Sequence, residues 1–202
     1  MDDDPSSGVA HASDGRFDGT CTACPIAVPG HHGGAYQFTG AQWIALPAIA
    51  DGLLGSQPYT VTVWIDADPE VKEETITEKS YNAVGELNIF KLFLNTGTVV
   101  TYETAMSAPS GFDIFDPSST SVASAWHHIA ARWDGAVKTV FIDGIAVGHE
   151  TPSAVIDTSA PVQIGADLDG GIQDNFFTGL IDDLRFYDSA LTDAEIVALA
   201  AQ

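Results

Sequence analysis

The stretch at residues 59–67, which reads YTVTVWIDA, decides the fold of this chain. Its β-branched and aromatic residues recur with a period of two, which is typical of a strand with one buried face. The side chains on that face are Tyr59, Val61, Val63 and Ile65. Trp64 lies on the opposite face, so we expect both sides of this strand to be covered.

Short strand signals of the same kind recur along the chain, separated by turns that contain glycine. We predict further strands at residues 35–38, 43–46, 75–79, 86–94, 98–104, 126–133, 137–142, 145–148, 162–164 and 180–187. Asp134-Gly135 is a typical hairpin turn between two of them. Residues 107–124 are rich in Ser, Pro and Asp, and we predict a long loop there.

Only the end of the chain carries a helical signal. Thr192 can cap a helix, and Glu195 three residues later completes a capping box. Together with the strand series, this predicts an all-β fold: a two-sheet antiparallel β-sandwich of the jelly-roll type with a short C-terminal helix. We interpret residues 1–13 as a flexible acidic lead-in and residues 14–202 as a single domain.

The charge balance restricts the partners of the protein. Its 202 residues include 28 acidic and 7 basic ones, which gives a formal net charge of -21. Nothing in such a chain neutralises a run of phosphates, so nucleic acid is excluded and anionic membranes are disfavoured. No stretch approaches the ~18 uninterrupted apolar residues of a membrane span. Asp outnumbers Glu by 20 to 8, which fits many turns and a cation site on an acidic surface.

The two cysteines, Cys21 and Cys24, allow three interpretations. A zinc site needs a second ligand pair that the sequence lacks, and the prolines and glycines that follow speak against a thioredoxin-like motif. We favour a small local disulfide over free thiols, and a disulfide indicates an oxidising compartment. The first residues do not resemble a secretion signal. We therefore interpret the chain as the mature part of an exported domain, located outside the cell or on its surface.

Beyond the strand pattern, the chain carries an ordered series of short motifs. They are Ser13-Asp14-Gly15, Asp18-Gly19-Thr20, AYQFTG at 35–40, TVTVWI at 60–65, WHHIA at 126–130, WDG at 133–135, FIDG at 141–144, IG at 164–165 and FTGLIDDLRFY at 177–187. Over residues 12–200 their order and spacing resemble the LamG-like jelly-roll domains of the concanavalin A-like lectin/glucanase superfamily. The resemblance implies two stacked antiparallel sheets, export and, in many members, a bound calcium ion, but it fixes no ligand.

Asp182 is the strongest candidate for a metal ligand. In a regular strand it shares a face with Leu184 and Phe186, where a carboxylate is costly unless it is paired or coordinated. Calcium suits such a site because it takes oxygen ligands, and the alternative is that Asp182 accepts hydrogen bonds from turn amides. The resemblance implies that Asp14 joins Asp182 in a calcium site. Carbonyl oxygens are expected from Gly19 and Gln42.

Trp43 and Trp133 are the candidate ligand-binding residues. Trp43 lies beside turns and Trp133 ends a hairpin strand, so either can be exposed. An exposed tryptophan near polar loops can stack on the face of a sugar ring, whereas partial burial at the rim of the sandwich is the alternative. We interpret Trp64 and Trp126 as core packing.

Two other groups of polar residues carry weaker signals. His127 and His128 are neighbours on a strand and face opposite sides, so we interpret them as structural, and nothing supports a metal role for the loop residues His31 and His32. Residues 167–174 superficially resemble an EF-hand loop but lack its Glu, so we predict a solvated loop, where a second surface calcium has room.

The sequence offers little sign of catalysis. Retaining glycosidases need two carboxylates about 5–5.5 Å apart across a cleft, and no Glu-x-Asp-x-Glu array provides them here. We therefore expect a non-catalytic, calcium-binding module for glycans or for cell-surface or extracellular partners. The rival interpretations are a glycoside hydrolase or polysaccharide lyase with an atypical site, and a purely structural module of a larger surface protein.

Overall fold

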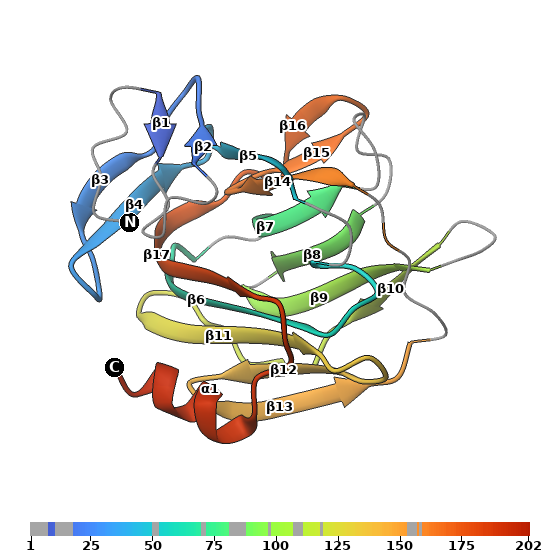
Figure 1. Ribbon diagram of the computed structural model, residues 1–202. Coiled ribbons are helices and arrows are strands. Elements are labelled where there is room, and N and C mark those ends of the chain that lie inside the picture. The colour runs from blue at the N-terminus through green and yellow to red at the C-terminus, as the bar shows by residue number, and fades with distance from the viewer. Residues whose placement is uncertain are drawn as a thin grey trace.

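The computed structural model (Figure 1) describes residues 8–10, 18–49, 53–69, 72–80, 88–96, 98–106, 111–117, 119–152, 157 and 159–202. Most of these residues lie in strands. The elements are β1 (Val9–Ala10), β2 (Gly19–Thr20), β3 (Ile26–Pro29), β4 (Gly34–Thr39), β5 (Ile44–Ile49), β6 (Tyr59–Ala67), β7 (Glu74–Ser80), β8 (Asn88–Asn95), β9 (Val99–Met106), β10 (Gly111–Phe115), β11 (Trp126–Trp133), β12 (Lys138–Ile142), β13 (Ile145–Glu150), β14 (Ala160–Ile164), β15 (Asp167–Asp169), β16 (Ile172–Asp174), β17 (Thr178–Tyr187) and α1 (Asp193–Ala200).

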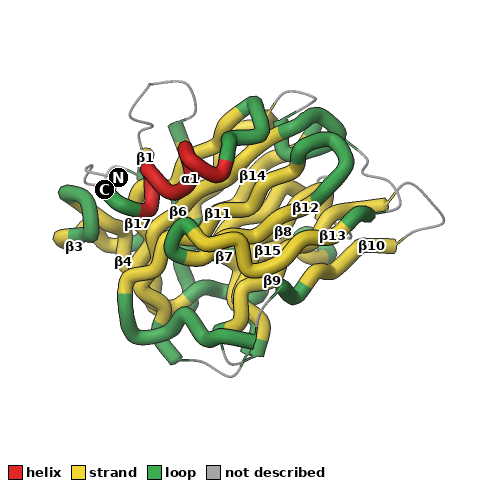
Figure 2. The backbone as a smooth tube through the Cα atoms, turned by 90° about the horizontal axis from the view of Figure 1, so that it is seen from below, coloured by secondary structure: helices red, strands yellow, loops and turns green. Residues whose placement is uncertain are grey.

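The strands form two large antiparallel sheets. An eight-stranded sheet, called sheet A below, has the order β1-β2-β5-β14-β7-β8-β9-β10, and a seven-stranded sheet, sheet B, has the order β13-β12-β11-β6-β17-β4-β3. β15 and β16 form a separate two-stranded sheet. The two sheets stack as a sandwich, and α1 lies beside sheet B (Figures 1 and 2). The predicted all-β jelly-roll sandwich is confirmed.

The core lies between the sheets and follows the alternation read from β6. The four side chains predicted for its buried face all have 0% exposure and belong to one apolar cluster. β6 pairs with β11 on one side and β17 on the other, which places it centrally in sheet B. Full burial of an apolar side chain of this size stabilises a fold by about 1.5–3 kcal/mol, so β6 contributes strongly to stability.

The expected lead-in and two expected loops contain strands. Within residues 107–124, β10 pairs with β9, and within residues 167–174, β15 and β16 form a hairpin. The prediction of a solvated loop at 167–174 is wrong, because Asp167 is buried against Lys91. Gly8–Ala10 belong to the predicted flexible lead-in, yet β1 pairs there with β2. The remainder of the lead-in lies outside the described residues, as does Asp14.

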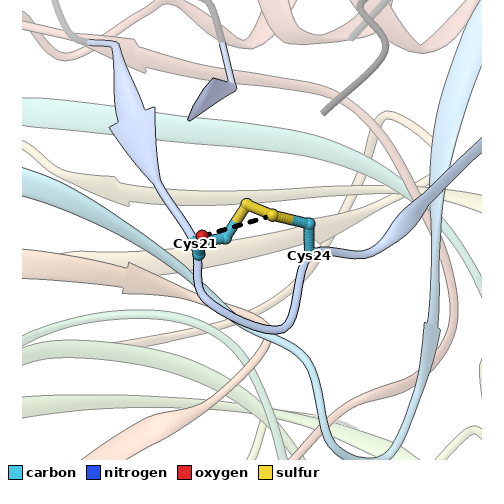
Figure 3. The surroundings of a disulfide bond; sticks show 2 residues. All are labelled: Cys21 and Cys24. Carbon is cyan, nitrogen blue, oxygen red and sulfur yellow. Dashed lines mark hydrogen bonds between the residues drawn. A yellow bond between two sulfur atoms is a disulfide. The ribbon is translucent and has the colours of Figure 1, made fainter. Parts of the chain in front are cut away.

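The disulfide prediction is confirmed. Cys21 and Cys24 are bonded, with their Cα atoms 5.0 Å apart, and they close a turn between β2 and β3 (Figure 3). The Cys21 backbone N–H also donates to the Gly8 carbonyl at 3.1 Å. The bond thus fixes a local turn next to β1 and links no distant parts of the fold, so its contribution to stability is small.

The predicted capping box of the helix is also present. The Glu195 N–H donates to the Thr192 hydroxyl, and the Thr192 N–H donates to the Glu195 carboxylate at 2.7 Å. Ile196 anchors the helix, because it is fully buried with Ala130 and Phe141 of sheet B. The helix therefore covers one part of the outer face of sheet B and leaves the rest to loops.

Candidate functional site

Asp182 lies on the outer face of sheet B. Its neighbour Ile181 belongs to the core, and Asp182 itself is paired with Trp64 of β6. A bulge follows, with Asp183 at a φ of 47°, and it shifts the alternation by one residue. Leu184 and Phe186 consequently pack against the core. The prediction that they share a face with Asp182 is wrong, because a regular strand was assumed where the bulge occurs.

A glycine-rich loop between β3 and β4 covers this carboxylate. The His32 backbone N–H donates to Asp182 Oδ2 at 2.7 Å, and Asp182 is only 1% exposed. A Cβ atom at Gly30 would lie 2.5 Å from the same oxygen, so the loop approaches this closely only because glycine is present. Asp182 therefore makes the hydrogen bond to a turn amide that the sequence left open as the alternative to a metal.

The surroundings of Asp182 give mixed support to calcium. Its other oxygen, Oδ1, is buried and has no hydrogen-bond partner in the part of the chain that the structure describes, as expected of a potential ligand. However, its neighbours among the described residues include the His32 backbone N–H, Gly30 and the strand partner Trp64, whereas calcium takes oxygen ligands. Within the described ranges, no three His, Cys, Asp or Glu side chains are arranged to hold a metal ion. These residues alone do not make a calcium site, and the ion stays a prediction.

The side chain of Gln42 is engaged at the opposite end of this part of β17 from Asp182. The Gln42 Oε1 accepts the Thr39 N–H at 2.8 Å, and Thr39 is paired with Thr178 of β17. Thr178 lies four residues before Asp182, a distance of about 13 Å along a strand. The Gln42 side-chain amide thus holds the β4–β5 turn, and the expectation that Gln42 lends a carbonyl oxygen to a calcium ion stays a prediction. Gly19 lies in sheet A beside the Ile44 and Leu46 side chains.

The rings next to Asp182 form a packed unit, which we call the His–Trp cluster; it contains His31, His32, Trp64, Trp126 and His128. The His31 ring stacks on Trp64 with centroids 3.7 Å apart, and His128 meets Trp64 edge-on at 5.4 Å. Trp64 is 7% exposed, which confirms that both sides of β6 are covered. Burial lowers the pKa of His128 to about 4, so this ring is neutral at physiological pH.

Trp133 is not a surface residue. It follows Ile129 and Ala131 on the inward face of β11, it is only 6% exposed, and its indole N–H donates to the Ser56 carbonyl at 3.2 Å. Of the two alternatives left open for Trp133, exposure and burial, the structure shows burial, so Trp133 does not serve as a ligand-binding residue in this arrangement. The alternation of β11 directs its side chain into the sandwich, where no sugar can reach it.

Trp43 is half-buried in the turn before β5, and it packs beside Phe176. The two ring centroids are 6.2 Å apart and the rings are tilted by 55°. Phe176 comes from the segment between β16 and β17, and the Gly40 N–H joins the two segments by donating to the Phe177 carbonyl at 3.1 Å. We call this pair of rings the Trp43 platform.

Polar side chains surround the platform. The Lys72 ammonium donates to the Phe176 carbonyl at 3.4 Å, and the Asn175 side-chain amide donates to Glu73 at 3.0 Å. Sequence reasoning found Trp43 but missed Phe176, Lys72 and Asn175. The available signal was the pair Phe176-Phe177 just before a strand: Phe177 is fully buried, so its neighbour is directed outward.

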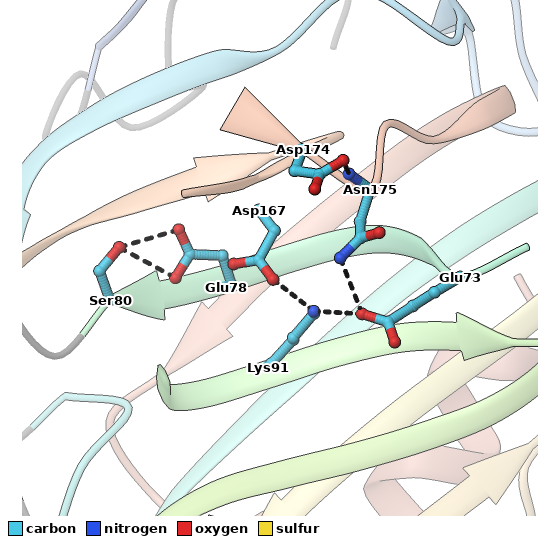
Figure 4. Close-up of polar contacts among 7 residues, drawn as sticks. All are labelled: Glu73, Glu78, Ser80, Lys91, Asp167, Asp174 and Asn175. Atoms are coloured by element: carbon cyan, nitrogen blue, oxygen red, sulfur yellow. Dashed lines mark hydrogen bonds and ion pairs between the residues drawn. The ribbon is translucent and has the colours of Figure 1, made fainter. Parts of the chain in front are cut away.

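Besides the His–Trp cluster and the Trp43 platform, a group of charged residues lies on the outer face of sheet A (Figure 4). We call it the Lys91 network; it contains Glu73, Glu78, Lys91, Glu103 and Asp167. The Lys91 ammonium bonds to Asp167 and to Glu73. The register places Glu78 and Glu103 on either side of Lys91 in β7 and β9. Burial raises the pKa of Glu78 well above its usual range and that of Glu103 to about 7. These carboxyls are 0% and 6% exposed, so in this arrangement they are closed to a polysaccharide.

The fold and its sites define a class of protein, a jelly-roll β-sandwich with aromatic groups at its rim. A profile of the family described as the concanavalin A-like lectin/glucanases superfamily (Laminin_G_3) matches residues 38–197, and the chain belongs to this family. The resemblance read from the motifs is thereby confirmed.

Three similar proteins illustrate the range of this class. Domain 4 of AbnA, an extracellular arabinanase of Geobacillus stearothermophilus solved with arabinotriose, is 25% identical with a TM-score of 0.71, and the match covers 93% of this chain and 91% of that one. The binding domain of Paraclostridial Mosquitocidal Protein 1 has a TM-score of 0.72 at 14% identity, covering 95% of this chain and 50% of that one. Adhesion G-protein coupled receptor V1 of Danio rerio is 23% identical over 71% of this chain, which spans 2% of the receptor.

The described residues contain no helix that is long and apolar enough to cross a membrane.

Proposed function

We propose that the protein is an exported, non-catalytic carbohydrate-binding module and that the Trp43 platform is its binding surface. The observation that carries this proposal is the half-buried Trp43–Phe176 pair, which lies on loops at the rim of the sandwich among polar side chains. The likeness of the whole chain to a domain that was solved with arabinotriose supports carbohydrate as the ligand. The Cys21–Cys24 disulfide supports an oxidising, extracellular location.

The platform would bind a sugar by two kinds of contact. The apolar C–H face of a sugar ring stacks on the indole of Trp43, while the amides and charged groups at the rim hydrogen-bond to the hydroxyls. Backbone hydrogen bonds hold the segment that carries Phe176: the Gly40 N–H joins it to the Trp43 turn, and the Thr75 N–H of β7 donates to the Asn175 carbonyl at 2.8 Å. The surface is therefore preformed, which reduces the entropy lost when a ligand binds.

A glycan array tests this proposal. We expect the wild-type protein to bind a subset of the immobilised oligosaccharides. Trp43→Ala should lose this binding while it stays folded, with an unfolding temperature only a few degrees below that of the wild type. Ile172→Ala is the matched control, because Ile172 is apolar and 71% exposed on the β15–β16 hairpin. Binding that survives in Trp43→Ala, or that is lost equally in the control, would contradict the assignment.

A cell-surface protein is the second candidate partner. The likeness to an adhesion receptor over 71% of this chain favours it. The two candidates differ in their response to enzymatic removal of glycans from cells. If the protein binds deglycosylated cells as well as it binds untreated cells, a protein partner is favoured over a sugar.

A further inference from the structure

We infer that the ligand of the Trp43 platform is a neutral glycan, one without carboxylate or sulfate groups; this rests on the proposed function. The argument begins with the basic residues, since anionic sugars are bound through charge-assisted hydrogen bonds from Arg and Lys. The sequence has 7 such residues in all. Arg16 lies outside the described residues, and the structure places the other six.

Five of these six are committed elsewhere. Lys79, Lys91 and Lys138 are buried, at 0%, 3% and 0% exposure. Arg132 and Arg185 each lie 2.6 Å from a carboxylate, of Asp193 and Asp183 respectively. All of these partners are intramolecular, so a ligand that recruited one of the five would have to break an existing ion pair or open the core.

The sixth, Lys72, lies at the platform and is already engaged there. Its ammonium is 3.7 Å from a Glu74 oxygen and donates to the Phe176 carbonyl at 3.4 Å. Glu73 lies next to it in the sequence with 36% of its side chain exposed, and the exposed Asp174 directly precedes Asn175 at the rim. The charge at the platform is therefore net negative.

The energetics of binding follow from this local charge. Salt screens charges beyond about 8 Å at physiological ionic strength, so the groups at the rim matter more than the net charge of the chain. Among the described residues, an anionic sugar there would find no unengaged cation to offset the water it loses, which is unfavourable. A neutral sugar needs only an aromatic face and hydrogen-bonding groups, and the platform offers both. The platform thus selects against acidic glycans by repulsion as well as by lack of attraction.

Calorimetric titration with matched ligand pairs tests this inference. The pairs are trigalacturonate with its neutral methyl ester and 3′-sialyllactose with lactose, with arabinotriose and cellotriose as further neutral probes. We expect at least one neutral probe to bind in a Trp43-dependent way. Its affinity should change less than about twofold between low and high salt, and each acidic partner should bind at least about tenfold more weakly than its neutral counterpart.

The outcomes separate the two proposals. If an acidic probe binds in a Trp43-dependent way with an affinity equal to or higher than that of its neutral partner, the inference is overturned. The proposed carbohydrate-binding function would still hold in that case. Affinity for a neutral probe that falls steeply with salt would also overturn the inference, because it would reveal a charge contact. Failure of every neutral and acidic probe to bind, with the glycan array also blank, would overturn the proposed function and the inference with it.

Discussion

The His–Trp cluster and the Trp43 platform are built from the same kind of residue with opposite results. Trp64 stands in the middle of β6 between two paired strands, and the His31 ring covers it, which leaves it 7% exposed. Trp43 lies in a turn, where Phe176 packs against one side of it and the side chain is half-buried. The difference teaches that the position of an aromatic residue in the sheet, more than its type, decides whether it serves stability or binding.

The largest expected effect is on folding stability, and it separates the two tryptophans directly. Trp64→Ala removes a buried ring and leaves a cavity under His31, so we expect it to lower the free energy of unfolding by about 3–5 kcal/mol. Trp43→Ala, the matched variant, should cost clearly less, about 1–2 kcal/mol, because part of the side chain is already exposed to solvent. Denaturant unfolding of both variants measures this, and equal losses would contradict the distinction.

The titration of His128 sharpens the same comparison. Its pKa in the folded protein is lowered to about 4 from an ordinary value of 6.5, so the unfolded chain binds the proton first as the pH falls. The stability that comes from the neutral ring is complete above pH 6.5 and is lost as the pH falls towards 4, by up to about 3 kcal/mol. His128→Gln should flatten this part of the pH–stability curve, and an unchanged slope would contradict the burial.

Glu103 in the Lys91 network gives a pH dependence of opposite sign. Burial raises its pKa in the folded state from 4.5 to about 7, so the folded protein retains the proton over this range. Stability from the neutral carboxyl is complete below pH 4.5 and is lost as the pH rises through about 7. Glu103→Gln, which stays neutral at every pH, should remove this loss. If the variant and the wild type show parallel curves between these pH values, Glu103 titrates normally.

Asp182 provides a smaller effect and a test of the calcium prediction. Asp182→Ala leaves the partly buried His32 N–H without its acceptor, which should cost about 1–3 kcal/mol whether or not a metal binds. If calcium also binds, EDTA lowers the unfolding midpoint of the wild type, added calcium restores it, and the variant does not respond. If EDTA leaves the unfolding midpoint unchanged and elemental analysis finds no metal, the calcium prediction is contradicted.

The sequence was most informative where local rules operate. The alternation in β6, the capping box at Thr192 and the Cys21–Cys24 bond all depend on residues close in the chain, and each was predicted. The bulge at Asp183 could not be predicted, because it depends on how β17 pairs with its neighbours. It places Leu184 and Phe186 on the core side, whereas a regular strand would have kept them on the same face as Asp182.

Contacts between distant segments account for the remaining differences. The Lys91 network joins β8 to β15 across 76 positions of sequence, and no local pattern indicated it. Trp133 and Trp43 looked alike in the sequence because both lie near turns. Only the register of β11 shows that Trp133 is directed into the core, and only the position of the β16–β17 segment brings Phe176 to Trp43.

The most direct test of the central claim is an NMR titration of isotope-labelled protein that observes the indole N–H groups. The chain has 4 tryptophans, so one signal is expected from each, and Trp→Phe variants assign them. On addition of an oligosaccharide selected from the array, we predict that the Trp43 signal shifts and saturates while those of Trp64 and Trp133 stay in place. A saturable shift of another indole with Trp43 unmoved would contradict the assignment of the binding surface.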